Sequence, residues 1–190
     1  MNYINRNPLI ICICGKAGSG KSTVGDYFFN LFNEYGSKVI VSPYTKYLKK
    51  YISYITGNIV DNNYKPRDLL QNLSNELIKN IMHDKDFFVR REIEDINFYS
   101  YFFDVIIIDD VRFPREIEIL KEKFSNVISV GIYRNNYDNN LTLKQKNDIT
   151  ETSLDNYNKY DYIINNDNIN ELKNRVKDIV LDIKRSENNG

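Results

Sequence analysis

Residues 9–22 read Leu9-Ile10-Ile11-Cys12-Ile13-Cys14-Gly15-Lys16-Ala17-Gly18-Ser19-Gly20-Lys21-Ser22. The first six side chains are all apolar, which is typical of a strand buried on both faces of a parallel sheet. A glycine-rich loop follows, and residues 21–33 then carry apolar side chains at helical spacing. Strand, glycine loop and helix in this order predict an α/β fold with the loop at the carboxyl end of its first strand.

The loop has the spacing Gly15-x4-Gly20-Lys21-Ser22. Glycines at this spacing let backbone N–H groups turn inward around a β-phosphate, while the lysine reaches the β- and γ-phosphates and the serine hydroxyl ligates Mg²⁺. We therefore expect ATP and Mg²⁺ as cofactors. The predicted ATP-binding residues are Gly15, Ala17, Gly18, Ser19, Gly20, Lys21, Ser22, Thr23 and, outside the loop, Arg134.

The remaining chain continues the alternation of strands and helices. Periodicity predicts strands at 38–42, 105–108, 127–133 and 162–164, and helices at 44–55, 67–82, 86–98, from 114 onward, and at 170–184. Residues 135–155 are polar and weakly patterned, so we expect an insert there with a short helix near 141–146, and a frayed tail at 185–190. With no repeat or linker, we expect one α/β domain over residues 1–190, with a five-stranded, mostly parallel sheet.

Composition restricts the possible partners. Lys plus Arg and Asp plus Glu number 26 each, so the formal net charge is zero and stable binding to nucleic acid is not expected. The longest apolar run is too short to span a membrane, and we expect a cytoplasmic location, or the host cytoplasm if a virus encodes the chain. We expect small-molecule nucleotide substrates as partners, and the oligomeric state stays open between monomer and homodimer. The two cysteines, Cys12 and Cys14, are expected as buried thiols.

Two acidic residues follow the apolar run at 105–108, namely Asp109 and Asp110. An acidic ligand for the metal belongs at the carboxyl end of a strand beside the loop. One of the two carboxylates is expected at the metal and the other near the acceptor or Arg112; we place Asp109 with Ser22 at the metal, although the sequence does not assign the pair. The predicted catalytic residues are Lys21, Asp109, Asp110 and Arg112.

Phosphoryl transfer develops negative charge on equatorial oxygens, so cations from outside the loop are expected as well. Arg67 begins a predicted helix and Arg112 follows the strand-end aspartates, so both are favoured as phosphate-binding cations. For Arg134 and the pair Arg90-Arg91, a solvent-exposed surface position without such a role stays an open alternative. Tyr44 offers a ring that could stack on a base, although aromatic residues are more often part of the core.

The tetrapeptide Asn158-Lys159-Tyr160-Asp161 matches the guanine-reading pattern of GTPases. In that pattern the motif follows a strand, whereas here it precedes one, and no switch motif follows Asp109. We interpret the match as chance in a chain rich in Asn, Lys and Asp.

Several segments resemble the deoxynucleoside monophosphate kinases of the bacteriophage type, within the P-loop nucleotide kinase group. They are Tyr44-x3-Leu48-Lys49, Arg67-x-Leu69-Leu70-Gln71-x-Leu73, Asp109-Asp110-Val111-Arg112-Phe113-Pro114-x-Glu116 and Asp161-Tyr162-Ile163-Ile164-x-Asn166. The segments occur in the expected order over most of the chain. Departures include Ser74 in place of glycine and Arg115 in place of asparagine, both beside the expected acceptor site.

The resemblance implies a three-layer P-loop kinase sandwich with acceptor-binding helices and a lid at about 135–155. It implies ATP-dependent phosphorylation of a deoxynucleoside 5′-monophosphate to the diphosphate. It suggests Arg67 and Gln71 as acceptor-binding residues. To these we add the aromatic residue Tyr44 and the arginine Arg91 as further predicted acceptor-binding residues. Two alternatives stay open: a P-loop kinase for another phosphorylated small molecule, and an ATPase switch or partner-binding module.

Overall fold

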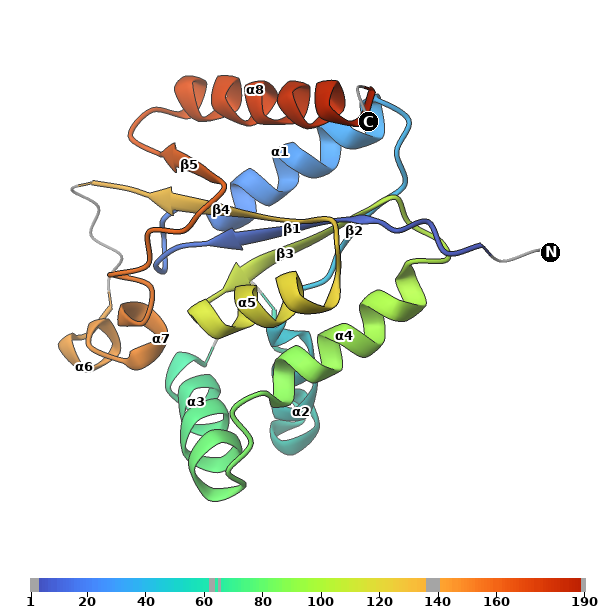
Figure 1. Ribbon diagram of the computed structural model, residues 1–190. Helices are drawn as coiled ribbons and strands as arrows, with labels where there is room; N and C mark the ends of the chain where they lie inside the picture. The colour runs from blue at the N-terminus through green and yellow to red at the C-terminus, as the bar shows by residue number, and fades with distance from the viewer. Residues whose placement is uncertain (1–3, 62–63, 65, 136–140, 189–190) are drawn as a thin grey trace.

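The computed structural model describes residues 4–61, 64, 66–135 and 141–188. Its centre is a five-stranded sheet in the order β2-β3-β1-β4-β5, and every neighbouring pair is parallel (Figure 1). The strands are β1 (Leu9–Cys14), β2 (Val39–Val41), β3 (Val105–Val111), β4 (Val127–Tyr133) and β5 (Tyr162–Asn165). The five-stranded α/β prediction is confirmed, with a sheet that is parallel throughout.

Helices cover both faces of this sheet. The helices are α1 (Lys21–Glu34), α2 (Thr45–Thr56), α3 (Arg67–Gln71), the π-helix η1 (Asn72–Ile81), α4 (Phe87–Tyr99), α5 (Pro114–Lys123), α6 (Leu143–Lys146), α7 (Ile149–Thr152) and α8 (Ile169–Asn188). Figure 1 shows α1 and α8 over one face and α4 and α5 over the other, while α6 and α7 lie beyond the strand ends marked by the arrowheads.

The alternation of side chains along β1 explains why the whole strand is apolar. Leu9, Ile11 and Ile13 join the core beneath α1 and α8, whereas Ile10, Cys12 and Cys14 join the core shared with α2, α4 and α5. All six residues are at most 3% exposed. A strand covered on both faces needs apolar residues at every position. Both cysteines are buried free thiols, as expected.

Three local expectations differ from the structure. The helix predicted at 67–82 is an α-helix that continues with π-type hydrogen bonding, as α3 and η1. Helix α8 does not fray after residue 184 but continues to Asn188, because Ile183 is still buried and Ser186 donates a hydrogen bond to the Asp182 carbonyl; residues 189–190 lie outside the description. The insert holds a second short helix, α7, that periodicity did not indicate. Residues 136–140 of the insert also lie outside the described part.

The parallel arrangement brings the carboxyl ends of β1, β3 and β4 to one edge of the sheet. The glycine loop after β1 and the two aspartates near the end of β3 therefore meet at this edge, which is where ligands bind in open α/β folds. Within the described residues, no helix combines the length and the apolar character that crossing a membrane requires.

Candidate active site

The loop after β1 adopts backbone conformations that favour glycine. Gly15 has φ 153° and Gly20 has φ 102°. A Cβ atom at Gly20 would lie 2.3 Å from the Asn166 side chain, and one at Gly15 would lie 2.7 Å from the Ile132 carbonyl oxygen. The Asn166 amide also donates a 2.8 Å hydrogen bond to the Ser19 carbonyl, so the chain before α8 supports the loop. The glycines are therefore required both by backbone conformation and by close packing.

The Lys21 side chain lies beneath this loop. Its ammonium group donates 2.8 Å hydrogen bonds to the carbonyl oxygens of Gly15 and Lys16, and the residue is 8% exposed. Burial, followed by the nearby Arg112 guanidinium, lowers the pKa of Lys21 to about 7. A bound polyphosphate would supply the negative charge that favours the protonated form.

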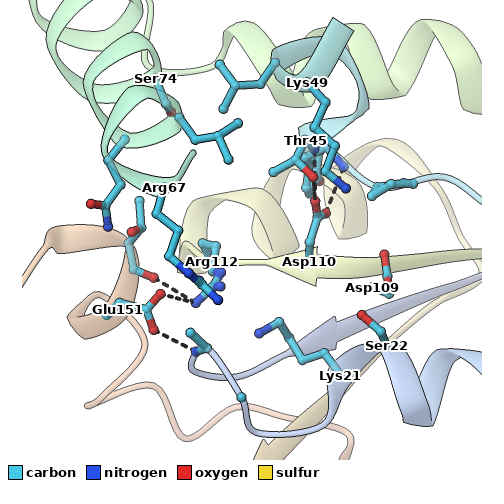
Figure 2. Close-up of a pocket in the computed structure, with 18 of the residues that line it drawn as sticks. Lys21, Ser22, Thr45, Lys49, Arg67, Ser74, Asp109, Asp110, Arg112 and Glu151 are labelled. Atoms are coloured by element: carbon cyan, nitrogen blue, oxygen red, sulfur yellow. Dashed lines mark hydrogen bonds and ion pairs between the residues drawn. The ribbon is translucent and has the colours of Figure 1, made fainter. Parts of the chain in front are cut away.

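Asp109 lies next to the first turn of α1. Gly25 allows this approach, because a Cβ there would meet the Asp109 Cβ at 3.3 Å. Figure 2 shows the side chains of Ser22 and Asp109 turned toward each other. Burial, then the neighbouring Asp110 carboxylate, raises the pKa of Asp109, while the Ser22 hydroxyl acts in the opposite direction. This hydroxyl and carboxylate are hard oxygen ligands of the kind that Mg²⁺ prefers.

The Asp110 carboxylate is directed away from Asp109, toward the start of α2. It accepts hydrogen bonds from the backbone N–H groups of Tyr44 and Thr45 at 2.8 and 2.9 Å, and from the Thr45 hydroxyl at 2.6 Å. The carboxylate thus accepts hydrogen bonds from donors at the helix start, and its negative charge interacts favourably with the positive end of the helix dipole. These contacts distinguish the surroundings of Asp110 from those of Asp109, a distinction that the sequence alone did not provide.

Arg112 and the insert meet over the loop. The Arg112 guanidinium donates a 2.9 Å hydrogen bond to one Glu151 carboxylate oxygen, and the other oxygen accepts a 2.7 Å bond from the Ala17 backbone N–H (Figure 2). Glu151 belongs to α7 and is 7% exposed. A residue of the insert therefore contacts both the glycine loop and the end of β3.

A cavity of about 680 Å³ opens beside these groups. Its lining includes the loop residues on one side and residues of α2, α3, η1 and α4 on the other. Leu48, Leu70 and Phe88 give it apolar walls, and Lys49 and Arg67 bring positive charge. Figure 2 shows the Arg67 side chain extending toward Arg112 and Glu151. Among the described residues Arg67 has no hydrogen-bond or ion-pair partner.

Most of the sequence-predicted site residues line this cavity. They are Ala17, Gly18, Gly20, Lys21, Ser22, Thr23, Tyr44, Arg67, Gln71, Asp109, Asp110, Arg112 and Arg134. Gly15 and Ser19 line a second, smaller hollow on the other side of the loop. Arg134 also donates a 3.3 Å hydrogen bond to the Gly18 carbonyl.

Two predicted acceptor residues are placed differently from the rest. Arg91 is not among the residues that line the cavity; it is exposed, pairs with Glu94 at 3.2 Å and lies 5.9 Å from the ring centre of Tyr47. Tyr44 lies at the cavity wall but is only 4% exposed, and its buried hydroxyl has no partner within the described structure. Tyr44 therefore packs mainly as a core residue.

Other polar residues line the cavity although they were not predicted as site residues, among them Lys49, Ser74 and Glu151. Lys49 lies close enough to Asp109 to oppose the rise in its pKa, and its only sequence signal is the Tyr44-x3-Leu48-Lys49 segment. Ser74 lies on η1 and is 9% exposed. Glu151 had no signal, because a carboxylate in a polar insert resembles any solvated acidic residue.

The guanine-type tetrapeptide has a structural role. The Asp161 carboxylate accepts hydrogen bonds from the Ser129 backbone N–H and hydroxyl, both at 2.7 Å, and from Lys121 at 2.6 Å. Asp161 thus joins β4, α5 and the start of β5, which agrees with the interpretation that the match is chance.

Comparisons with solved structures support the kinase fold. The chain aligns over 96% of its length with the whole of a shikimate kinase from Aquifex aeolicus vf5, at 17% identity and a TM-score of 0.51. It aligns over 91% of its length with 95% of an APS kinase from Mycobacterium tuberculosis, determined with AMPPNP and APS, at 13% identity and a TM-score of 0.58. At these identities the likeness concerns the fold alone.

Sequence comparison identifies the family. No curated protein is significantly similar in sequence. The family model for deoxynucleotide monophosphate kinases, however, matches residues 34–176, which is most of the chain and begins after the glycine loop. The match therefore includes the cavity wall, the strand-end aspartates and the insert, and a phosphotransferase of the nucleotide kinase type is the activity class it supports. The chain belongs to the deoxynucleotide monophosphate kinase family.

Proposed function

We propose that this protein transfers the γ-phosphoryl group of ATP to a deoxynucleoside 5′-monophosphate, giving ADP and the deoxynucleoside diphosphate. The observation that carries the proposal is that one cavity joins the glycine loop to the Arg67 guanidinium, which has no partner among the described residues. A phosphate donor and a phosphorylated acceptor both need such cationic or N–H-rich groups. A hydrolytic ATPase needs only the first of these sites.

The donor side consists of the loop, Lys21 and Arg134. Backbone N–H groups of residues 18–22 would surround the β-phosphate, and Lys21 would exchange its two carbonyl contacts for phosphate oxygens. The buried Ser19 hydroxyl has no partner within the described residues, which fits a group that hydrogen-bonds a ligand. Arg134, at the root of the insert, would contact the triphosphate from outside the loop.

The donor set beside the loop fits a magnesium ion. Ser22 and Asp109 supply one hydroxyl and one carboxylate, and Mg²⁺ in such sites completes its coordination with water and substrate phosphate oxygens. When bound, the ion would neutralise charge on the β- and γ-phosphates. Asp109 would hold it while Asp110 keeps α2 in place.

The acceptor side consists of Arg67, Lys49 and Gln71. Arg67 would bind the 5′-phosphate as a bidentate donor, and Lys49 would add charge near Asp109. Gln71 lies one helical turn after Arg67 and lines the cavity, where its amide would hydrogen-bond a base edge. The apolar side chains of Leu70 and Phe88 would cover the base.

The chemistry then requires alignment more than acid–base catalysis. An acceptor phosphate oxygen is already anionic near neutral pH, so it can attack the γ-phosphorus without losing a proton to a base. The new P–O bond forms as the bond to the ADP oxygen breaks. Lys21 and Arg112 would stabilise the charge on the transferred group. We further propose that the insert at about 135–155 acts as a lid that excludes water, which would otherwise compete with the acceptor.

An ADP-release assay with ATP and Mg²⁺ tests the function. The acceptors are the four deoxynucleoside monophosphates, the four ribonucleotides and non-nucleotide phosphate esters such as phosphomevalonate, with Lys21→Ala as the inactive control. We expect ADP release that depends on at least one deoxynucleoside monophosphate, with the diphosphate identified by chromatography. Release with only a non-nucleotide ester would favour the second kinase alternative, and release without any acceptor would favour an ATPase.

A further inference from the structure

Glu151 forms a bridge between two parts of the site that are distant in sequence. One carboxylate oxygen accepts the Ala17 backbone N–H at 2.7 Å, and the other accepts the Arg112 guanidinium at 2.9 Å. Ala17 is 134 residues away from Glu151 and Arg112 is 39 residues away. The Glu151 side chain is 7% exposed and that of Arg112 is 22% exposed, so water screens the pair only weakly.

Glu151 is the strongest anchor of the Arg112 guanidinium. The other acceptors of the same nitrogen are the carbonyl oxygens of Gly15 and Thr150, each at 3.4 Å. A hydrogen bond at 2.9 Å between two charged groups is stronger than a contact of the same guanidinium with a neutral carbonyl oxygen at 3.4 Å. Without the carboxylate, the guanidinium would be free to adopt other rotamers of a long side chain.

The position of Glu151 is itself fixed from the acceptor side of the cavity. Asp148 accepts hydrogen bonds from the Thr150 backbone N–H and hydroxyl at the start of α7, and it also accepts the Asn75 amide of η1 at 3.2 Å. Just before this, Gln145 donates a 2.7 Å bond to Asp68 of α3. Ser153, after α7, donates to the Arg112 carbonyl oxygen. The insert is therefore tied to α3, which carries Arg67 and Gln71, and to η1, which continues it.

We propose that Glu151 is a positioning residue for phosphoryl transfer, which acts by holding the Arg112 guanidinium and the Ala17 end of the glycine loop in their reactive arrangement. This inference rests on the role proposed above for Arg112. Glu151 contacts no substrate in this role, so its loss lowers kcat and leaves the KM values for ATP and for the acceptor nearly unchanged.

A double-mutant cycle tests this role. Glu151→Gln keeps the shape of the side chain but places an N–H₂ group against one of the two donors, and we expect kcat to fall about 10- to 100-fold, as for a misaligned reactive group. Arg112→Ala should lower kcat at least as much. The double variant should stay within about threefold of Arg112→Ala alone, because a residue that acts through Arg112 has little left to position once Arg112 is gone.

Two further variants guard against a loss of fold. Glu151→Asp keeps the negative charge. With Arg112 present, its kcat should lie between those of the wild type and Glu151→Gln. In the Arg112→Ala background, Glu151→Asp and Glu151→Gln should have the same kcat. Asp155→Asn is the matched control: it removes another insert carboxylate that contacts the loop, through an exposed 2.7 Å pair with Lys16, and kcat should change less than about threefold. Thermal melting confirms that each variant is folded.

Several outcomes would overturn the inference. The first is an unchanged kcat in Glu151→Gln, and the second is a raised kcat, which would mean that the carboxylate competes with a phosphate. The third is an increase confined to the KM for ATP. The fourth is a double variant whose loss of kcat equals the product of the losses in the two single variants. The cycle is run with whichever acceptor the wild type uses best. If that acceptor is not a deoxynucleoside monophosphate, the proposed function fails while the cycle still decides the role of Glu151.

Discussion

The Asp110 carboxylate accepts both the backbone N–H and the hydroxyl of Thr45, at 2.9 and 2.6 Å. Asp110 lies near the end of β3 and Thr45 is the first residue of α2, so the contact fixes one wall of the cavity to the edge of the sheet. The adjacent Asp109 is left to face Ser22. Neighbouring residues of a strand point to opposite faces, and here this divides two carboxylates between the proposed metal site and a helix start.

Replacing Asp110 by Asn should therefore cost stability. An amide keeps one acceptor oxygen and turns an N–H₂ group toward the donors of Tyr44 and Thr45, and we expect a loss of about 1–2 kcal/mol in the free energy of unfolding. Urea denaturation measures it. Thr45→Val removes only the hydroxyl bond and should cost less. An Asp110→Asn variant that is as stable as the wild type would contradict this role.

Lys21→Ala should lower kcat by at least about 10²- to 10³-fold, because the substitution removes the preorganised charge that we propose for the transferred phosphoryl group. The coupled ADP-release assay measures the rate. Lys16→Ala, in the same loop, removes only the exposed pair with Asp155, so its effect should be much smaller. Equal rates for Lys21→Ala and the wild type would refute the proposed donor site.

Arg67→Ala should raise the KM for the acceptor at least about tenfold while the KM for ATP changes little, because a charge-assisted bond to a phosphate is worth roughly 1.5–3 kcal/mol. Arg91→Ala makes the comparison specific: the sequence placed Arg91 at the acceptor, whereas its side chain lies outside the cavity lining. We expect a smaller change in acceptor KM for Arg91→Ala. Equal increases in both KM values for Arg67→Ala would place it elsewhere in the mechanism.

The sequence was sufficient for features that depend on local pattern. The apolar run of β1, the glycine spacing and the proline at the start of α5 each determine their own segment, and the order of strands and helices then brings Lys21, Asp109 and Arg112 together at one sheet edge. That edge contains most of the residues selected in advance.

Contacts between distant segments could not be predicted in this way. The bond from Ala17 to Glu151 depends on how the insert folds back over the loop, and nothing in the periodicity near Glu151 indicates this. The same holds for Arg91, whose orientation is set by packing against Tyr47 and Phe87 rather than by its place in the chain. Polar residues have many possible partners, so sequence spacing alone does not select one.

A buried charge cluster outside the cavity should make stability depend on pH. Glu92 is fully buried on α4 and accepts a 2.7 Å hydrogen bond from Lys46 of α2, while its other carboxylate oxygen has no partner within the described structure. Lys46 also pairs with Asp95, so two carboxylates share one ammonium group. Burial raises the pKa of Glu92 from 4.5 to about 7 despite the lysine.

The sign of the effect follows from this rise. Between pH 4.5 and 7 the folded state binds more protons than the unfolded state at Glu92, so the contribution of Glu92 to stability falls as the pH rises through this window and is constant above it. The stability of the wild type relative to Glu92→Gln should decline by up to about 3 kcal/mol across the window. Urea denaturation at several pH values measures the difference. Glu94→Gln, an exposed change on the same helix, is the control, and its stability difference from the wild type should hardly depend on pH. If the difference for Glu92→Gln is also independent of pH, Glu92 keeps its ordinary pKa in the folded protein.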